Sequence, residues 1–124
     1  MQDKKDIEKL LQGWESIFRQ GLLTFWTFVV LDGVSGDVGT IRTGVERLTG
    51  GSYQPSEQVL YRQLRRHTDV GLVNRHQEAT PNGPPKNIFE LSELGGGVLK
   101  EFANRNIRPF NQPAVQAIIE RGAK

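Results

Sequence analysis

The chain has 124 residues, enough for one domain with a modest core. Apolar residues make up 36% and charged residues 24%, as in globular proteins, and the net charge at pH 7 is only +2. The absence of cysteine excludes a disulfide framework and a cysteine zinc site. The longest apolar stretch, residues 22–31, is about half the ~20 residues of a membrane span. Since the charged N-terminus also lacks a signal-peptide pattern, we expect a cytoplasmic protein without membrane contact.

The first part of the chain, residues 3–20, predicts an amphipathic helix of about five turns. Its apolar side chains recur at helical spacing, with charged residues between them. They are Ile7, Leu10, Leu11, Trp14, Ile17 and Phe18. The helix is long for so small a chain, so we expect this stripe to pack against a second subunit.

Gly21 is expected to interrupt that helix. Residues 22–31 are apolar almost all round, which predicts a buried central helix. A buried strand is the alternative, because Thr, Phe and Val favour strands. Trp14, Trp26 and Phe110 are candidates to line an aromatic pocket between subunits, although packing in a core or interface is the commoner role of such residues.

A turn at residues 32–36 precedes another predicted helix. Asp37, or Ser35 before it, is the expected N-cap. The inner face then carries apolar residues at helical spacing, namely Val38, Ile41, Val45 and Leu48. Gly50 and Gly51 end this helix and the next begins near residue 57, a separation typical of helix-turn-helix units.

Residues 54–73 predict an amphipathic helix with both ends marked. Ser56 is a good N-cap, and Gly71 is a natural left-handed stop. Leu60 and Leu64 fall on one side of the helix. The opposite side is polar and carries Gln58, Arg62, Arg65 and Asp69, flanked by Tyr61 and Arg66. Amide and guanidinium groups suit base edges and phosphates, so we interpret this segment as a candidate DNA-recognition helix.

The charge of the chain is concentrated near that helix. Residues 61–76 hold four arginines and one aspartate, a local charge of +3 in a chain whose total is +2. Such concentration is typical of an element that enters a DNA groove. From the helix alone, a surface helix whose arginines only keep the chain in solution is an equally good interpretation.

Residues 72–78 and 87–91 predict two strands joined by a hairpin. Asn82-Gly83 is expected to supply the left-handed positions of the turn. Pro84 and Pro85 cannot donate to a ladder, so we expect the tip to project rather than pair. A hairpin with a basic tip directly after a polar helix is typical of a winged helix.

Two more helices are expected towards the C-terminus. Residues 92–105 predict a helix capped by Ser92, with the apolar residues Leu94, Val98, Leu99 and Phe102 facing inward. Gly95, Gly96 and Gly97 lie within it and each costs about 1 kcal/mol against alanine, which indicates a late start, a close backbone approach or a hinge. After a linker, Pro113 is expected to begin a short helix that ends near Arg121 and docks on the domain or on a partner.

Three motifs, one after another along the chain, are similar to those of one known family. They are Pro55-Ser56 leading to Leu60-Tyr61-Arg62-Gln63-Leu64-Arg65-Arg66, then Gly71-Leu72-Val73, then Gly83-Pro84-Pro85-Lys86-Asn87-Ile88-Phe89-Glu90-Leu91-Ser92-Glu93-Leu94-Gly95. With these motifs, residues 22–96 resemble the PadR-type transcriptional regulators. The Leu-Tyr-Arg of the helix and the Gly-Pro-Pro-Lys of the hairpin, in this order, make the resemblance specific.

The resemblance implies a fold that is mainly α with a small β-hairpin: a winged helix-turn-helix with extra N- and C-terminal helices for dimerisation. It divides the chain into an N-terminal dimerisation helix (residues 1–21), a winged-helix DNA-binding domain (22–95) and a C-terminal helical dimerisation segment (96–124). It also implies a homodimer that represses nearby genes, often until a small hydrophobic or aromatic effector binds, and a protein without catalytic activity.

The chain departs from the family pattern in four places. Gln58-Val59 stand where the family usually has Gly-Thr, and residues 37–39 replace a usual His-Gly-Tyr. His67 stands where a leucine normally follows the two arginines. We expect His67 to be partly buried and hydrogen-bonded, with a pKa lowered by burial. Gly96 and Gly97 replace charged residues of the family.

These inferences define the candidate sites. Double-stranded DNA is the expected partner, contacted by Ser56, Gln58, Tyr61, Arg62, Arg65, Arg66, Arg75, Lys86 and Asn87. In the dimer interface we expect the N-terminal stripe together with Val115, Ile118 and Ile119. We expect no catalytic residue, cofactor or metal, because the chain has two histidines and no cysteine and shows no paired acid motif or phosphate loop. The alternative is a winged-helix protein-interaction module without sequence-specific DNA binding, which the small net charge favours slightly.

Overall fold

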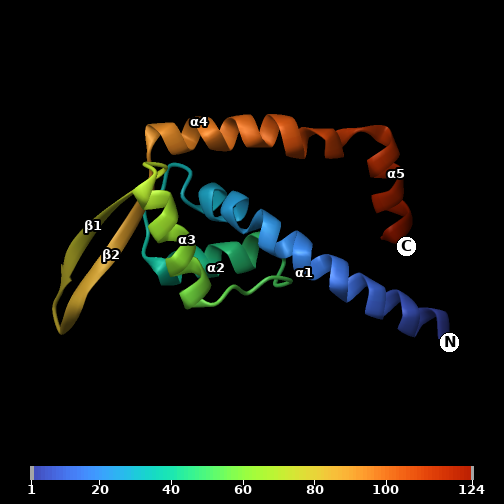
Figure 1. Ribbon diagram of the computed structural model, residues 1–124, viewed down its shortest axis with the longest axis horizontal. Helices are drawn as coiled ribbons and strands as arrows, with labels where there is room; N and C mark the ends of the chain where they lie inside the picture. The colour runs from blue at the N-terminus through green and yellow to red at the C-terminus, as the bar shows by residue number, and fades with distance from the viewer. Residues whose placement is uncertain (1, 124) are drawn as a thin grey trace.

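The computed structural model describes residues 2–123. Figure 1 shows a small central body from which a hairpin and two helical segments extend. In chain order the elements are α1 (Gln2–Val30), α2 (Val38–Leu48), α3 (Glu57–Asp69), β1 (Val73–Thr80), β2 (Gly83–Leu91), α4 (Glu93–Phe102), a π-helical turn η1 (Ala103–Ile107), a 3-10 turn η2 (Arg108–Asn111) and α5 (Pro113–Gly122). The expected fold class, mainly helical with one small antiparallel hairpin, is confirmed.

Helix α1 runs without a break through Gly21, so the expected interruption there is wrong. The strand alternative for residues 22–31 is wrong as well. One exposed glycine costs a helix about 1 kcal/mol. Burying a leucine or phenylalanine side chain contributes about 1.5–3 kcal/mol, and Leu23 and Phe28 are both buried after Gly21. The packing of its C-terminal half therefore keeps α1 helical past the glycine.

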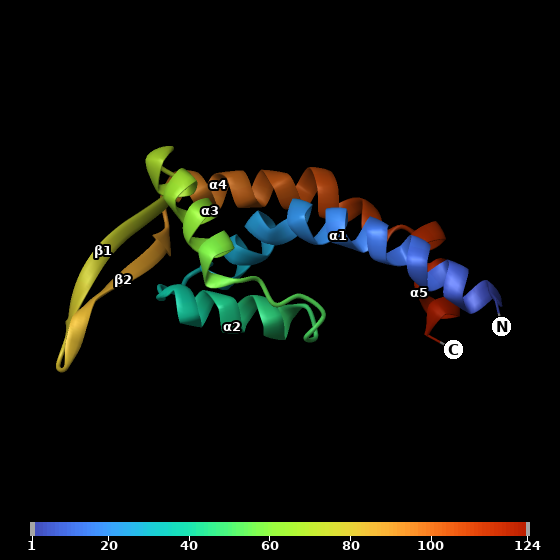
Figure 2. The same cartoon turned by 60° about the horizontal axis from the view of Figure 1, so that its bottom comes forward.

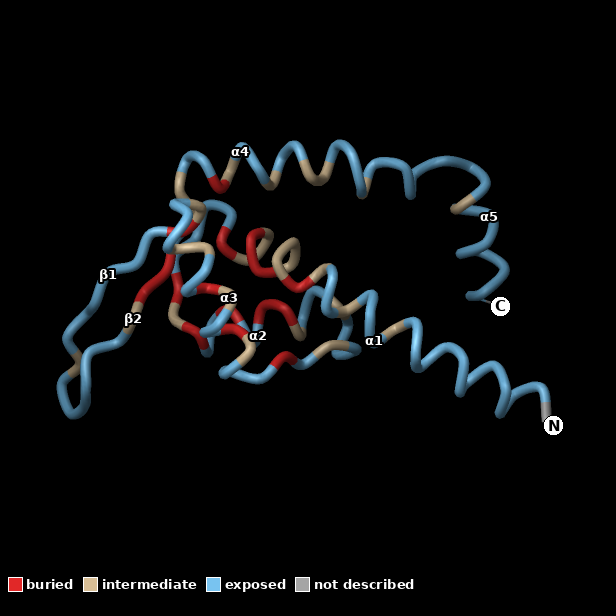
Figure 3. The backbone as a smooth tube through the Cα atoms, in the orientation of Figure 1, coloured by how far each residue is buried: buried red, intermediate tan, exposed pale blue. Residues whose placement is uncertain are grey.

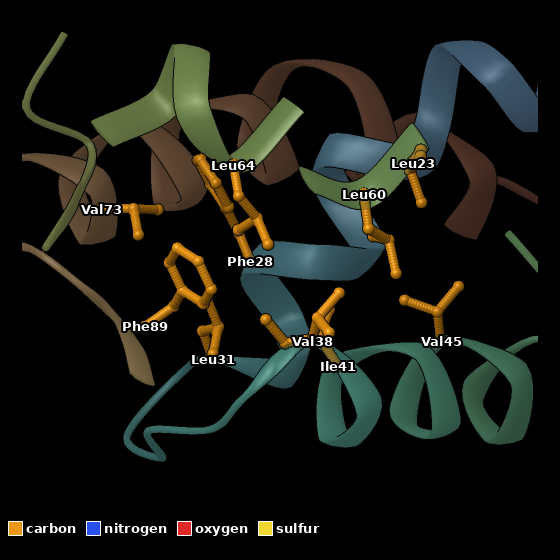
Figure 4. Packing of buried hydrophobic residues seen from close by; sticks show 10 residues of the cluster. All are labelled: Leu23, Phe28, Leu31, Val38, Ile41, Val45, Leu60, Leu64, Val73 and Phe89. Carbon is orange, nitrogen blue, oxygen red and sulfur yellow. The ribbon is translucent and has the colours of Figure 1, made fainter. Parts of the chain in front are cut away.

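The core lies where the C-terminal half of α1, helices α2 and α3, and the base of the hairpin meet (Figure 4). Its buried residues are Leu23, Phe28, Leu31, Val38, Ile41, Val45, Leu60, Leu64, Val73 and Phe89. Asp37 caps α2, because its Oδ1 accepts a hydrogen bond from the Thr40 backbone N at 2.8 Å. The expected inner face of α2 is confirmed except at Leu48, which is 42% exposed because it lies in the last turn, beyond the reach of α3.

The hairpin pairs β1 with β2 from Val73↔Leu91 at its base to Thr80↔Gly83 at its tip. Outside the two strands, Gly36 forms an isolated antiparallel bridge with Phe89, exchanging backbone hydrogen bonds at 2.9 and 3.0 Å. The expected left-handed turn is wrong, since neither Asn82 nor Gly83 has a positive φ. The turn is shifted to Pro81-Asn82, and the proline ring holds φ near −65°, which excludes a left-handed first position.

The tip of the hairpin projects, but it is also paired, which the sequence interpretation did not anticipate. Pro84 and Pro85 belong to β2 and lie opposite the register shift between Glu78 and Thr80. The Thr80 hydroxyl donates towards the carbonyls of Gly83 and Pro84 at 2.9 and 3.0 Å, which closes the end. In Figures 1 and 2 the hairpin extends away from the helices.

Helix α4 begins at once after β2, and its glycines differ in role. The Ser92 hydroxyl accepts the Gly95 backbone N–H at 3.0 Å and donates to the Gly71 carbonyl at 2.6 Å. A Cβ on Gly95 would collide with the Leu72 carbonyl oxygen, so this glycine permits a close backbone approach. Gly96 and Gly97 face open space. The helix therefore begins directly after Ser92, without the late start that the glycines suggested, and its third residue, Gly95, already packs against Leu72.

Two of the four residues expected to face inward on α4 do not. Leu94 and Val98 are 58% and 43% exposed. Gly95, Leu99 and Phe102 instead share the face towards α1, and the Phe102 ring lies 5.7 Å from that of Phe25. The tight contact of Gly95 fixes this rotation, because residues at i, i+4 and i+7 share one side of a helix.

Two exposed segments extend beyond the core. We call residues 2–21 the N-terminal arm and residues 103–123, comprising η1, η2 and α5, the C-terminal arm. In Figure 3 both are mostly exposed, whereas buried residues gather in the centre. Pro113 occupies the first turn of α5, as expected. Of the helices within residues 2–123, none has the length and apolarity needed to cross a membrane.

Candidate nucleic-acid interface

Helix α3 is held with its polar side outward by both of its ends and by its apolar residues. The Ser56 hydroxyl accepts the Val59 backbone N–H at 3.2 Å, so its predicted capping role is confirmed. Gly71 has φ +82°, and the Leu72 backbone N–H returns to the His67 carbonyl at 2.9 Å. Leu60 and Leu64 are fully buried, which fixes the rotation of the helix on the core.

The outward side of α3 carries charge without protein partners. Gln58, Arg62, Arg65 and Arg66 are exposed, and Tyr61 is 40% exposed. Within residues 2–123, none of the three guanidinium groups lies within 4.0 Å of a carboxylate. Their hydrogen-bond donors face solvent, so this side of the helix can accept an anionic partner without breaking an existing ion pair.

A hollow of about 380 Å³ lies between α3 and the hairpin. It brings together four of the residues that the sequence assigned to DNA contact, Tyr61, Arg65, Arg75 and Asn87. The Gln77 amide lies 3.4 Å from the Asn87 side-chain oxygen and helps to orient it. Two guanidinium groups from different elements thus border one concave surface, which suits a phosphate backbone.

The same hollow contains two polar residues outside the predicted set of DNA contacts, Thr68 and Asp69. Both lie near the end of α3, one and a half to two helical turns after the Leu-Tyr-Arg motif. Helical spacing predicts the outward position of Asp69, which it shares with Arg62 and Arg65, and its exposure in the structure agrees. Asp69 was not assigned a DNA contact, because a carboxylate repels phosphate.

Lys86 lies at another part of the hairpin. Its ammonium nitrogen is 3.6 Å from Asp37 Oδ2, at the N-cap of α2. Hydrogen bonds from Thr40 are the main cause of a lowered Asp37 pKa, with Lys86 contributing less. Lys86 remains 57% exposed, and an exposed ion pair of this kind contributes little. A phosphate can therefore compete with Asp37 for this lysine.

The model of the transcriptional regulator PadR-like family matches residues 38–101, more than half of the chain. The chain belongs to the PadR-like family of transcriptional regulators. A comparison with curated protein sequences found no match.

Several solved PadR-type structures share the fold. A padr family transcriptional regulator from Eggerthella lenta has a TM-score of 0.71 at 14% identity, with 94% of this chain and 97% of that chain covered. A PadR-like regulator from Bacillus cereus has a TM-score of 0.59 at 16% identity, covering 86% and 95%. Bacillus subtilis PadR in complex with operator DNA has a TM-score of 0.60 at 16% identity. The match covers 65% of this chain but only 46% of that one.

His67 occupies the seam between α1 and α3 in this PadR-like chain. Its Nε2 lies 3.2 Å from the Thr24 hydroxyl, which also donates towards Gln63 Oε1 at 3.2 Å. The imidazole stands edge-on to Phe28, with ring centroids 5.0 Å apart. Desolvation lowers the pKa of His67, and the neighbouring Arg66 charge lowers it further. The expectation of a half-buried, hydrogen-bonded histidine is confirmed.

The residues assigned to a dimer interface are nearly all exposed. In the N-terminal arm the exposed fractions are 62% for Ile7, 76% for Leu10, 39% for Leu11, 73% for Trp14, 73% for Ile17 and 50% for Phe18. In α5, Ile118 and Ile119 are 59% and 52% exposed and Val115 is half-buried. Each arm therefore presents an apolar stripe that this chain does not cover.

The three aromatic residues considered for a pocket do not meet within one chain. Trp26 borders a hollow of about 250 Å³ with Phe18 and Tyr53, between α1 and the loop that leads to α3. Trp14 and Phe110 are not part of that hollow and are 73% and 46% exposed. Burial is the main cause of a raised Tyr53 pKa, so its hydroxyl stays a neutral hydrogen-bond donor at physiological pH.

Proposed function

We propose that the chain is a sequence-specific DNA-binding repressor that acts as a homodimer. The observation that carries this proposal is the row of exposed arginines on α3, which have no carboxylate partner in the described part of the chain. Beside it lies the hollow bordered by Arg65 and Arg75. A surface of this kind binds phosphates and base edges, and membership in a family of transcriptional regulators supports the same use.

In this proposal α3 enters the major groove. Gln58, Arg62 and Arg65 lie nearest the base edges, while Tyr61 and Arg66 contact phosphates. The exposed Ser56 lies at the start of the helix, where it can contact a phosphate beside the backbone N–H groups of the first turn that remain free. From the hairpin, Arg75, Lys86 and Asn87 reach the backbone or the neighbouring minor groove. The similar fold of a PadR that was solved with operator DNA supports this mode of binding.

The two arms supply the homodimer in this proposal. Their apolar stripes are exposed along two segments that have few neighbours in the chain (Figure 3). Packing against a second copy would remove both stripes from water. Two recognition helices would then meet a near-palindromic site, with half-sites separated by about 34 Å, one turn of DNA. Binding of this kind over a promoter would repress the gene behind it.

A small hydrophobic or aromatic effector belongs to the same proposal. The 250 Å³ hollow holds the Trp26, Phe18 and Tyr53 side chains and lies against the loop that leads into α3. A ligand wedged there would shift the start of the recognition helix. Titration with planar aromatic compounds, with quenching of tryptophan fluorescence as the signal, tests effector binding separately from DNA binding.

The test of the main proposal begins by selecting duplexes from a random library with the purified full chain. Arg62→Ala is then compared with Arg105→Ala, which removes the same charge from η1. If Arg62 forms a bidentate contact to guanine, its loss should cost about 1–3 kcal/mol of binding and relax the preference at one base pair. Arg105→Ala should bind like the parent. An Arg62→Ala variant with unchanged affinity and preference would contradict the assigned face. Absence of DNA binding by the parent would favour a protein-interaction module.

A further inference from the structure

Asp69 is an acid in a place where the fold gives it no stabilising partner. It is the last residue of α3, at the negative end of the helix dipole, where a carboxylate is disfavoured. Its side chain is exposed, and within residues 2–123 it makes no ion pair or side-chain hydrogen bond. Arg65 stands one helical turn earlier, yet the two groups lie beyond 4.0 Å of each other. Local stability therefore does not account for this residue.

The position of Asp69 relative to the arginines is specific. It borders the hollow between α3 and the hairpin, together with Arg65, Arg75, Tyr61 and Asn87. It is the one acid among the residues that line this hollow. A carboxylate beside two guanidinium groups lowers the positive potential of the concavity, the reverse of what would maximise affinity for a phosphate.

We propose that Asp69 determines specificity by repelling phosphates from this hollow. The inference rests on the proposed DNA binding. On unrelated sequences, contacts to DNA are mainly ion pairs between arginines and phosphates, and a phosphate held by Arg65 and Arg75 would stabilise such complexes. Repulsion by Asp69 weakens them. On the correct site Arg65 contacts a base edge instead of sharing a phosphate with Arg75, so the repulsion costs less there.

The size of the effect follows from Coulomb's law. Removing one unit charge about 5 Å from a phosphate in water changes an equilibrium constant about fourfold. Asp69→Asn should therefore bind a random duplex about fourfold more tightly, with a salt slope steeper by about one unit. Its affinity for the selected duplex should change by less than about twofold, so the ratio of specific to non-specific affinity falls.

The experiment measures fluorescence anisotropy on a random duplex and on a duplex selected by the parent chain. Asp69→Asn is compared with Asp69→Glu, which keeps the charge and should behave like the parent. Asp32→Asn is the matched control, because it removes one exposed acid from the turn after α1, outside the hollow and outside both arms. Thermal unfolding confirms that each variant is folded.

The outcomes separate this inference from the proposed function. The repulsion is supported if Asp69→Asn binds the random duplex more tightly than the parent while Asp69→Glu and the control variant do not. Equal binding by Asp69→Asn and the parent overturns it. So does weaker binding to the selected duplex with relaxed preference at one base pair, since Asp69 would then be a direct reader of cytosine. If the parent binds neither duplex, the proposed function itself fails.

Discussion

The central body and the two arms use the same apolar residue types at the same helical spacing, with opposite results. Leu60 of α3 is fully buried, whereas Leu10 in the N-terminal arm is 76% exposed. In the body, side chains from α1, α2, α3 and the hairpin converge from several directions. The N-terminal arm instead extends away from the other helices (Figure 1). Periodicity thus identifies an apolar face, and the number of neighbouring elements decides whether the chain itself buries it.

The largest expected contrast is between the same substitution in the two regions. Leu60→Ala should lower the free energy of unfolding by about 2–5 kcal/mol, because it removes a fully buried side chain and leaves a cavity. Leu10→Ala should change it by less than about 0.5 kcal/mol in dilute protein. Chemical denaturation at low concentration measures both.

The N-terminal arm has a separate readout. Leu10→Ala should weaken self-association, as followed by analytical ultracentrifugation, and should remove any dependence of the melting temperature on protein concentration. Equal loss of stability in Leu60→Ala and Leu10→Ala at all concentrations would show that the arm belongs to the core of a single chain.

A second contrast lies within α4, where neighbouring glycines have different surroundings. Gly95→Ala forces a Cβ into the Leu72 carbonyl and should cost about 1–3 kcal/mol. Gly96→Ala adds a methyl group in open space and should raise stability by about 1 kcal/mol, since alanine is the better helix former. The free energy of unfolding of the two variants should therefore move in opposite directions. If both variants were stabilised, the close contact between α4 and the residue before β1 would be wrong.

The smallest expected effect is the pH dependence contributed by His67. Its folded pKa lies below 6.5, so the unfolded chain takes up the proton first as the pH falls. The stability it contributes is complete above pH 6.5 and is lost below it. The unfolding free energy of the parent should therefore decline between about pH 7.5 and 5.5 more steeply than that of His67→Gln. A His67→Gln slope identical to that of the parent would mean that protonation at the α1–α3 seam does not affect folding.

Much of the fold could be predicted because its signals are local. Ser56, Asp37, Ser92 and Gly71 mark helix ends by their own side chain or backbone, and all four have their predicted roles. The outward side of α3 follows from periodicity alone, since Leu60 and Leu64 fix its rotation.

The errors arose where a distant contact overrides a local preference. Gly21 failed to break α1 because the buried half of the helix holds it, and Leu94 was placed inward because the contact of Gly95 with Leu72 is invisible in the sequence. At the candidate site, helical spacing placed Arg65 on the outward side, but it could not bring Arg75 and Asn87 beside it, since that proximity depends on the angle of the hairpin. The outward position of Asp69 was predicted, but not a role for it, because a carboxylate does not bind phosphate.

The most direct test of the central claim is the binding of the purified full chain to DNA at two salt concentrations. Fluorescence anisotropy is measured on a random duplex and on a selected duplex at about 50 and 200 mM salt. The change with salt reports the contacts to phosphates, and the difference between the duplexes reports the sequence preference. Exposed arginines on α3 predict tighter binding to the selected duplex, and affinities for both that fall steeply as salt rises. Binding that is absent, insensitive to salt or equal for the two duplexes would contradict the account.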